Sequence, residues 1–284
     1  MKKLYMLAVA LILISCNQTK KEETNTDQSS ETQKEAIPVE PNEGIGDGAV
    51  SITDSFIGSI EKAHKKSDFL KHKAISFNIN IIFGGKEHLD GKITMLTNST
   101  KIRIDKKDET KLIYNGEKVF LCPEDATAGG ARFDMFTWTY FFGLPYKLND
   151  PGTQWDLKND LPLDGVDHHT AKLTFKPGTG DAPKDWYVIY TDTEKNTLKA
   201  AAYIVTFGSG DDISKAEEDP HAIQYKNFEM VEGIPFATYW EFYGWQEDKG
   251  MTQKLGEATI TDITFLEDEG AIFETPDNSK EISL

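Results

Sequence analysis

The side chains with the clearest potential for chemistry are two adjacent histidines, His168 and His169, which follow Asp164 and Asp167. An imidazole beside a carboxylate can act as a general base or bind a metal ion. Adjacent side chains on a strand point to opposite faces, so both histidines cannot hold one metal ion without a bend. Two interpretations stay open: a His/Asp cluster of a hydrolase, or a surface turn at the start of a strand, which we favour.

Three further polar groups offer weaker chemistry. Residues 178–181 have the glycine-rich composition of a phosphate-binding loop, but no helix is expected to follow them, so a hairpin turn is favoured. Asp211, Asp212 and the acidic residues 217–219 match no calcium-loop spacing and indicate a solvated loop. Cys122 has no partner motif and is interpreted as a small apolar residue. We predict no catalytic set, metal or cofactor; whether the protein is an enzyme stays open, and we favour a protein that is not one.

Residues 133–146 form an aromatic segment, since seven of the fourteen residues are Phe, Trp or Tyr. These rings do not form one stripe, so the segment is expected to be a short helix that is buried on several sides and ended by Pro145. A filled core and a cavity wall need the same residue types, so a core helix and a wall for an apolar ligand both remain possible. The predicted ligand-binding residues are Phe136, Trp138, Phe141, Phe142, Trp186, Tyr187, Trp240 and Trp245.

An amphipathic helix is predicted before this segment, over residues 50–70. Ile52, Phe56 and Ile60 recur at helical spacing, and Thr53 or Asp54 can cap the first turn. The predicted helix has about four turns. Its apolar stripe should pack on the sheet that follows.

The period of the apolar residues then changes to two, which predicts strands. The predicted strands cover residues 75–81, 89–96, 101–105, 111–114, 118–122, 169–175, 186–191, 198–207, 223–230, 236–245 and 258–265. Gly84-Gly85 and Asn115-Gly116 predict tight turns between strands. Helices do not alternate with these strands, which argues against a parallel sheet. We predict a mainly β (α+β) fold with one antiparallel, strongly curved sheet and few helices.

The first sixteen residues predict export and a lipid anchor. Residues 1–15 combine two lysines with an apolar run that is too short to span a bilayer, as in a signal peptide. The run ends in Leu-Ile-Ser-Cys16, which resembles the lipobox of bacterial lipoproteins. That resemblance implies cleavage before Cys16 and acylation of this residue. Two or more acyl chains give stable membrane anchoring.

Composition divides the rest of the chain. Residues 16–48 are polar and lack aromatic residues, so they are interpreted as a disordered tether, and residues 49–284 as one domain. The chain has 31 basic and 47 acidic residues and a formal net charge of −16. Nucleic-acid binding and docking by a polybasic patch both need a basic surface, so the charge argues against them. Membrane attachment would therefore come from lipid on Cys16.

Several stretches resemble a DUF6503-type family of flavobacterial lipoproteins. They are residues 140–145, 150–152, 172–175, 185–187, 190–192 and 202–206. More distantly, the order of elements is similar to the LolA/LolB/LppX-like superfamily, including a Tyr-x-x-Tyr-x-Asp strand at Tyr187. This resemblance implies a half-barrel whose concave face holds lipid or acyl chains. The inward arginine of LolA cannot be mapped here, since Arg103 and Arg132 are the only arginines.

The sequence therefore predicts an envelope lipoprotein that binds an apolar or amphipathic ligand, such as a lipid or acyl chain, in the concave face of a LolA-like half-barrel. The predicted location is the outer membrane, on its periplasmic face or at the cell surface. The alternatives are an envelope hydrolase that uses the His/Asp cluster, and a scaffold lipoprotein that binds another envelope protein. The oligomeric state stays open.

Overall fold

A computed structural model describes residues 50–267 and 270–283. The predicted signal peptide, Cys16 and most of the predicted tether lie outside the described residues, so these predictions stay untested. Among the described residues, no helix is both long and apolar enough to cross a bilayer. The helices are α1 (Ile52–Ala63), α2 (Lys66–Phe69), α3 (Ala131–Lys147) and α4 (Ser214–Glu218).

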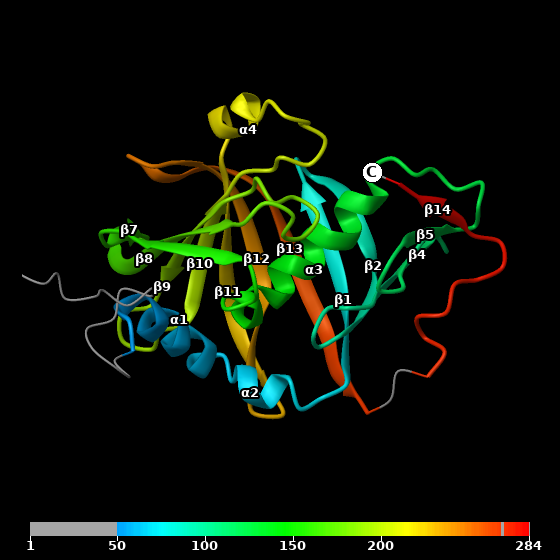
Figure 1. The fold of residues 1–284 in the computed structure, drawn as a ribbon, viewed down its shortest axis with the longest axis horizontal. Helices are drawn as coiled ribbons and strands as arrows, with labels where there is room; N and C mark the ends of the chain where they lie inside the picture. Colours follow the sequence, from blue (N-terminus) through cyan, green and yellow to red (C-terminus); the bar gives the residue numbers. More distant parts are fainter. Residues whose placement is uncertain (1–49, 268–269, 284) are drawn as a thin grey trace, which may run out of the picture. The chain divides into compact units, whose positions relative to one another are not determined.

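The strands alternate in direction along one antiparallel sheet (Figure 1). They are β1 (Ala74–Phe83), β2 (Lys86–Leu96), β3 (Ile102–Lys106), β4 (Lys111–Tyr114), β5 (Val119–Cys122), β6 (Thr153–Leu157), β7 (Leu161–Leu163), β8 (Val166–Phe175), β9 (Tyr187–Thr191), β10 (Leu198–Tyr203), β11 (His221–Val231), β12 (Ile234–Gln246), β13 (Gly250–Leu266) and β14 (Lys280–Ile282). The order across the sheet is β14-β5-β4-β3-β2-β1-β13-β12-β11-β10-β9-β8-β6, and β7 pairs with β8.

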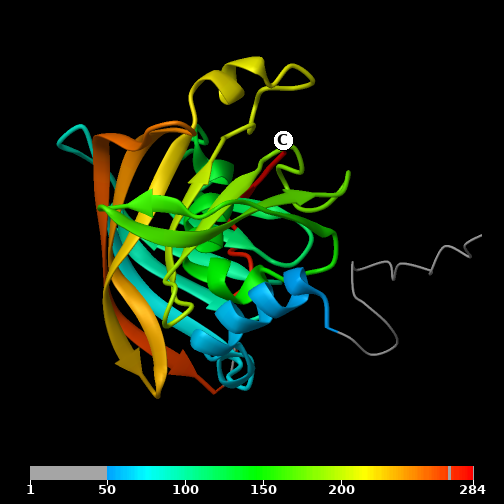
Figure 2. The ribbon, with the colours of Figure 1, turned by 90° about the vertical axis from the view of Figure 1, so that its left-hand side faces the viewer.

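The sheet curves around α3, which lies on its concave side (Figure 2). The predicted antiparallel, strongly curved sheet with few helices is therefore confirmed. Two meanders make up most of this sheet, one from β1 to β5 and one from β6 to β13, and they meet where β1 pairs with β13. The last strand, β14, pairs with β5 at the edge of the first meander. The main core lies between α3, α1 and the concave face, with Phe77 and Ile79 of β1 and Trp240 of β12 fully or almost fully buried.

The predicted N-terminal helix is present but is divided in two. The Ser51 side chain accepts a hydrogen bond from the Asp54 amide at 2.9 Å, so Ser51 caps α1 in place of the predicted Thr53 or Asp54. Lys65 adopts a left-handed conformation with φ 57°, which ends the first helix before α2 starts. The predicted four continuous turns are therefore wrong, because the chain bends sharply at this residue.

His64 follows α1 and is almost completely buried. Its Nε2 accepts a hydrogen bond from the Leu198 amide at 2.9 Å, and its ring contacts Tyr146 and Phe228. An acceptor nitrogen carries no proton, so the ring is neutral. Burial, and then the charge of Lys199, lower the pKa of His64 from 6.5 to about 4.

The two predicted turns differ in the structure. Gly84 and Gly85 connect β1 to β2 directly, and both have positive φ, as a two-residue hairpin turn requires. Between β4 and β5, Tyr114 pairs with Val119, so the loop contains four residues and not two. The Asn115 side chain accepts hydrogen bonds from the amides of Glu117 and Lys118, which holds the wider turn.

The aromatic helix α3 continues past Pro145 to Lys147, so the prediction that this proline ends the helix is wrong. Proline has no N–H, and the Phe141 carbonyl therefore receives no helical hydrogen bond from position 145. The Tyr225 hydroxyl of β11 donates to that carbonyl at 3.0 Å. Replacing the missing bond in this way fixes the C-terminal half of α3 to the sheet.

The N-terminal turn of α3 is fixed by a buried carboxylate. Asp134 accepts hydrogen bonds from His88 at 2.9 Å, Lys106 at 2.8 Å and Trp138 at 2.9 Å. Burial raises the pKa of Asp134, but these bonds and the charge of Lys106 have a larger combined effect in the opposite direction. The pKa of Asp134 is therefore lowered overall. Both ends of α3 are thus held against the sheet by polar contacts.

Candidate functional site

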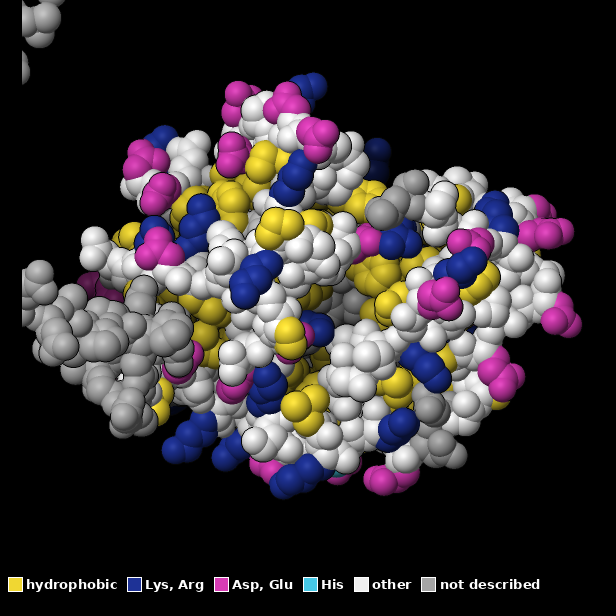
Figure 3. Space-filling model, viewed as in Figure 1, with side chains coloured by type: hydrophobic (Ala, Val, Ile, Leu, Met, Phe, Trp, Pro, Cys, Tyr) yellow, Lys and Arg dark blue, Asp and Glu magenta, His cyan; other side chains and the backbone are white. Residues whose placement is uncertain are grey.

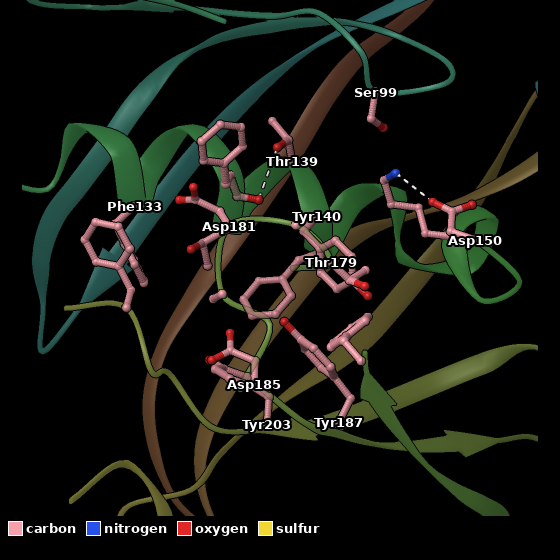
Figure 4. A pocket seen from close by; sticks show the side chains of 18 of the residues that line it. Ser99, Phe133, Thr139, Tyr140, Asp150, Thr179, Asp181, Asp185, Tyr187 and Tyr203 are labelled. Carbon is pink, nitrogen blue, oxygen red and sulfur yellow. Dashed lines mark hydrogen bonds and ion pairs between the residues drawn. The ribbon is translucent and has the colours of Figure 1, made fainter. Parts of the chain in front are cut away.

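A cavity of about 610 Å³ lies beside α3 and is also bounded by β8, β9, β10 and the loops before β9 and after β10. Its volume is in the range of pockets that hold small molecules. On the face shown in Figure 3, hydrophobic side chains fill hollows around the middle of the molecule. Figure 4 shows the lining from close by, with Phe133, Thr139 and Tyr140 of α3 labelled together with Asp181, Asp185, Tyr187 and Tyr203.

Aromatic side chains form most of the apolar lining. Phe133, Phe136 and Phe141 come from α3, and Tyr187 and Tyr203 come from β9 and β10. The Phe141 and Tyr203 rings lie 4.8 Å apart between centroids, and those of Tyr187 and Tyr203 lie 6.2 Å apart. Aromatic rings at these distances pack favourably and make a stiff wall. The cavity can therefore accept an apolar group.

Two ion pairs border the cavity. Arg132 on α3 donates to both carboxylate oxygens of Asp181, with Nε to Oδ2 at 3.1 Å. Lys147, at the other end of α3, lies 3.1 Å from Asp150. Both basic groups are thus paired with carboxylates from the loops around β6 and before β9. The pairs connect α3 to the loop before β6 and to the loop before β9.

Asp185 is a half-buried carboxylate in the lining. Its Oδ1 accepts hydrogen bonds from the amide of Thr206 at 2.8 Å and from the Thr206 hydroxyl at 2.7 Å. Burial raises the pKa of Asp185, and the two bonds from Thr206 offset part of this effect. These bonds also fix the chain after β10 at the cavity.

Tyr140 of α3 places a hydroxyl in the same region. This hydroxyl is buried and has no hydrogen-bond partner among the described residues. A buried hydroxyl without a partner costs about 1–3 kcal/mol relative to a satisfied one. Its ring lies 5.3 Å from that of Tyr187, and burial raises the pKa of both phenols. A bound molecule or water could supply the missing partner.

The predicted ligand-binding residues fall into three groups. Phe136, Phe141 and Tyr187 line the cavity. Phe142 and Trp240 border a second space of only about 20 Å³ beneath the C-terminal half of α3. The remaining three predicted residues do not line either space. They are Trp138, which is buried in the main core, and Trp186 and Trp245, which belong to a separate cluster on the other face of the sheet.

Most lining residues were not among the predicted ligand-binding residues, and these include Tyr140, Tyr203 and Asp185. Tyr140 lies inside the aromatic segment, so the segment itself was a usable signal. Tyr187 and Tyr203 pair directly across β9 and β10, which places them on one face. No comparable pattern marks Asp185, because its role depends on the fold of the loop before β9.

The predicted polar clusters do not form a site. His168 and His169 alternate along β8: one ring is buried and bonded to the Val166 carbonyl at 2.8 Å, and the other lies 3.0 Å from Asp160. Asp164 instead accepts from Gln224 at 2.5 Å. None of these side chains borders the cavity. The structure does not bring together the cluster that a hydrolase would need.

The weaker candidates also have structural roles. Within residues 176–185 the loop turns at Gly178 and Gly180, which both have positive φ, and leads to β9 without a helix. Asp211 binds Lys184 in an exposed loop. Cys122 is buried and its Sγ donates to Asn278 at 3.1 Å. In the described part of the chain, no group of three His, Cys, Asp or Glu side chains is arranged to hold a metal ion.

Comparison with known proteins gives structural similarity alone. No protein-family model matches the chain, and no curated protein matches it. A LolA-superfamily protein from Nitrosomonas europaea is similar with a TM-score of 0.49 and 12% identity, covering 76% of this chain and 97% of that one. A putative outer membrane lipoprotein-sorting protein domain from Vibrio parahaemolyticus gives 0.49 and 10%, covering 78% and 97%.

A DUF1329-family protein from Desulfovibrio piger ATCC 29098 is similar with a TM-score of 0.47 and 15% identity, covering 76% of this chain and 96% of that one. LolA-like proteins, which the order of elements predicted, are thus among the solved structures that resemble this chain. The resemblance to DUF6503-type lipoproteins stays a prediction. These similarities assign neither a ligand nor an activity to this chain.

Proposed function

We propose that this protein binds an apolar or amphipathic molecule, such as a lipid or acyl chain, in the cavity beside α3. The observation that carries the proposal is a cavity of about 610 Å³ with aromatic walls and a few polar groups. Ligand sites in proteins combine these two properties. The buried hydroxyl of Tyr140, which has no partner within the described part of the chain, supports the proposal, because a ligand can satisfy it.

The first experiment looks for lipid that stays with the purified protein. The full chain carries Cys16→Ser, so that no acyl chain can be attached at that position, and is analysed by native mass spectrometry and by solvent extraction. We expect non-covalently bound lipid in this Cys16→Ser chain, or uptake of a fluorescent fatty-acyl probe. A chain that purifies empty and takes up no probe would contradict the proposal.

A pair of matched variants tests the location of the site. Val205→Trp places a large ring in the cavity lining, whereas Val166→Trp makes the same change at a position that is 59% exposed and away from the cavity. We expect the first variant to lose most of its bound lipid and the second to retain it. Equal binding by both variants, with folding checked by circular dichroism, would place the ligand elsewhere.

We also propose that the chain is a lipoprotein, anchored through Cys16 to the outer membrane at its periplasmic face or at the cell surface. The support is the sequence of residues 1–16. Cells grown with a clickable palmitate analogue should label the wild-type protein and leave Cys16→Ser unlabelled. Protease treatment of intact cells then distinguishes the two faces. Labelling that persists in Cys16→Ser would contradict anchoring through this residue.

A further inference from the structure

The carboxylates around the cavity differ in how they are neutralised. Asp150 and Asp181 each pair with a basic side chain, and Glu117 is exposed in the turn between β4 and β5. Asp185 is half-buried, and both of its hydrogen bonds come from Thr206 and end on Oδ1. No described residue forms a salt bridge with it, so its Oδ2 and its negative charge are available to a ligand.

Three tyrosines, Tyr140, Tyr187 and Tyr203, line the same cavity as this carboxylate. Figure 4 shows the Asp185 carboxyl group beside Tyr203 and on the same side as the Tyr187 hydroxyl. Tyr140 packs against Tyr187 at 5.3 Å, and its buried hydroxyl lacks a partner among the described residues. Burial raises the pKa of both Tyr140 and Tyr187, and the charge of Asp185 adds a smaller effect, after those of Asp150 on Tyr140 and of Tyr140 on Tyr187. A carboxylate together with aromatic faces attracts a cation.

An anionic polar end would fit this region poorly. Arg132 and Lys147 are the basic residues of the lining, and each is already paired with a carboxylate. A fatty-acid carboxylate that approached either basic group would also lie beside the negative charge of Asp181 or Asp150. Placed near Asp185 instead, it would bring a second negative charge to a half-buried site.

We propose that the cavity selects an amphiphile whose polar end is an ammonium group, held by Asp185 and the rings of Tyr187 and Tyr203. The alkyl chain then lies along the phenylalanines of α3. This inference rests on the proposed function, because it names the class of ligand for the same cavity. Asp185 contributes the charge, and the tyrosine rings contribute cation–π attraction and shape.

The test compares three ligands with the same ten-carbon chain: decyltrimethylammonium, decanol and decanoate. Isothermal titration calorimetry of the full chain carrying Cys16→Ser, below the micelle concentration, measures each Kd. We expect the ammonium ligand to bind at least about tenfold more tightly than decanoate, with decanol between them. This ranking is measured in a protein with an unaltered cavity, so it does not depend on the folding of a cavity variant.

Asp185→Asn removes the charge and keeps an oxygen that can accept the bonds from Thr206. We expect it to weaken binding of the ammonium ligand by about tenfold and to leave decanol within about twofold. Asp167→Asn makes the same change at an exposed position outside the cavity and should alter neither Kd.

Two outcomes would overturn the inference in distinguishable ways. If the three ligands bind equally, or if Asp185→Asn leaves the ammonium Kd unchanged, the head-group selection is refuted while binding of an amphiphile in the cavity stands. If none of the three binds and the native protein holds no lipid, the proposed function falls together with the selection.

Discussion

His64 allows the strongest quantitative prediction, because it is a buried, neutral histidine with a defined acceptor role. Its pKa is 6.5 in an unfolded chain and about 4 in the folded protein. The unfolded state therefore binds the proton more tightly, and acid favours unfolding. The contribution of His64 to stability is complete above pH 6.5 and is lost as the pH falls from 6.5 toward 4.

The magnitude follows from the two pKa values. One pKa unit corresponds to about 1.4 kcal/mol, so the full shift is worth about 3 kcal/mol, and about 2 kcal/mol of this is lost between pH 7.5 and pH 5. Protonation would also remove the acceptor of the Leu198 amide, which is a buried backbone donor. The destabilisation is thus expected to be local to the contact between α1 and β10.

Urea unfolding, followed by tryptophan fluorescence at pH 7.5, 6 and 5, measures the effect. The comparison is between the wild type and His64→Asn, which retains an acceptor but does not titrate. The stability advantage of the wild type should shrink by about 2 kcal/mol between pH 7.5 and pH 5. His169→Asn changes a half-exposed histidine and serves as the control. A stability difference between wild type and His64→Asn that does not vary with pH would refute the reasoning.

Three further substitutions test the contacts that hold α3. Asp134→Ala should lower the free energy of unfolding by about 3 kcal/mol in urea unfolding, because it leaves a half-buried cation and an indole N–H without their acceptor; an effect below about 1 kcal/mol would argue against the network. Tyr225→Phe should cost about 1–2 kcal/mol in the same assay, since Pro145 leaves the Phe141 carbonyl without a helical donor; an unchanged stability would show that this carbonyl finds another partner. In ligand-free protein, Tyr140→Phe should leave stability unchanged or raise it by up to about 1 kcal/mol, whereas in lipid-bound protein it should lower stability. Thermal denaturation with and without ligand measures both effects. A clear loss of stability in ligand-free protein would mean that the hydroxyl already has a hydrogen-bond partner.

The sequence predicted the sheet well because period-two patterns depend on local residue types. It missed β6, β7 and β14, which have five residues or fewer and carry no regular alternation. It also placed the end of the aromatic helix at Pro145, because proline removes a helical hydrogen bond. In the structure, the helix continues, and the hydroxyl of Tyr225 on a distant strand replaces that bond. Such long-range compensation leaves no local sequence signal.

The candidate site was predicted in part, and strand geometry explains which part. Trp186 and Tyr187 are neighbours, so only one of them can face the cavity once they enter a strand, and Tyr187 does. Trp240 and Trp245 are five residues apart on β12 and likewise belong to clusters on opposite faces. The alternation of side chains along a strand therefore excludes one member of each pair from the concave face of the sheet. The place of Asp185 depends on a loop that joins two strands, which no periodicity describes.

The join between β1 and β13 has a consequence for the order in which this chain can fold. Ala74 pairs with Leu266, so the two strands are separated by almost the entire described sequence. During synthesis the first meander is complete long before β13 emerges, and the backbone hydrogen-bonding groups along its β1 edge stay unpaired for that time. Contacts of such high sequence separation form slowly, and unpaired edges favour aggregation. A chain shortened before residue 250 would leave β1 paired with β2 alone, so one of its edges would stay permanently unpaired.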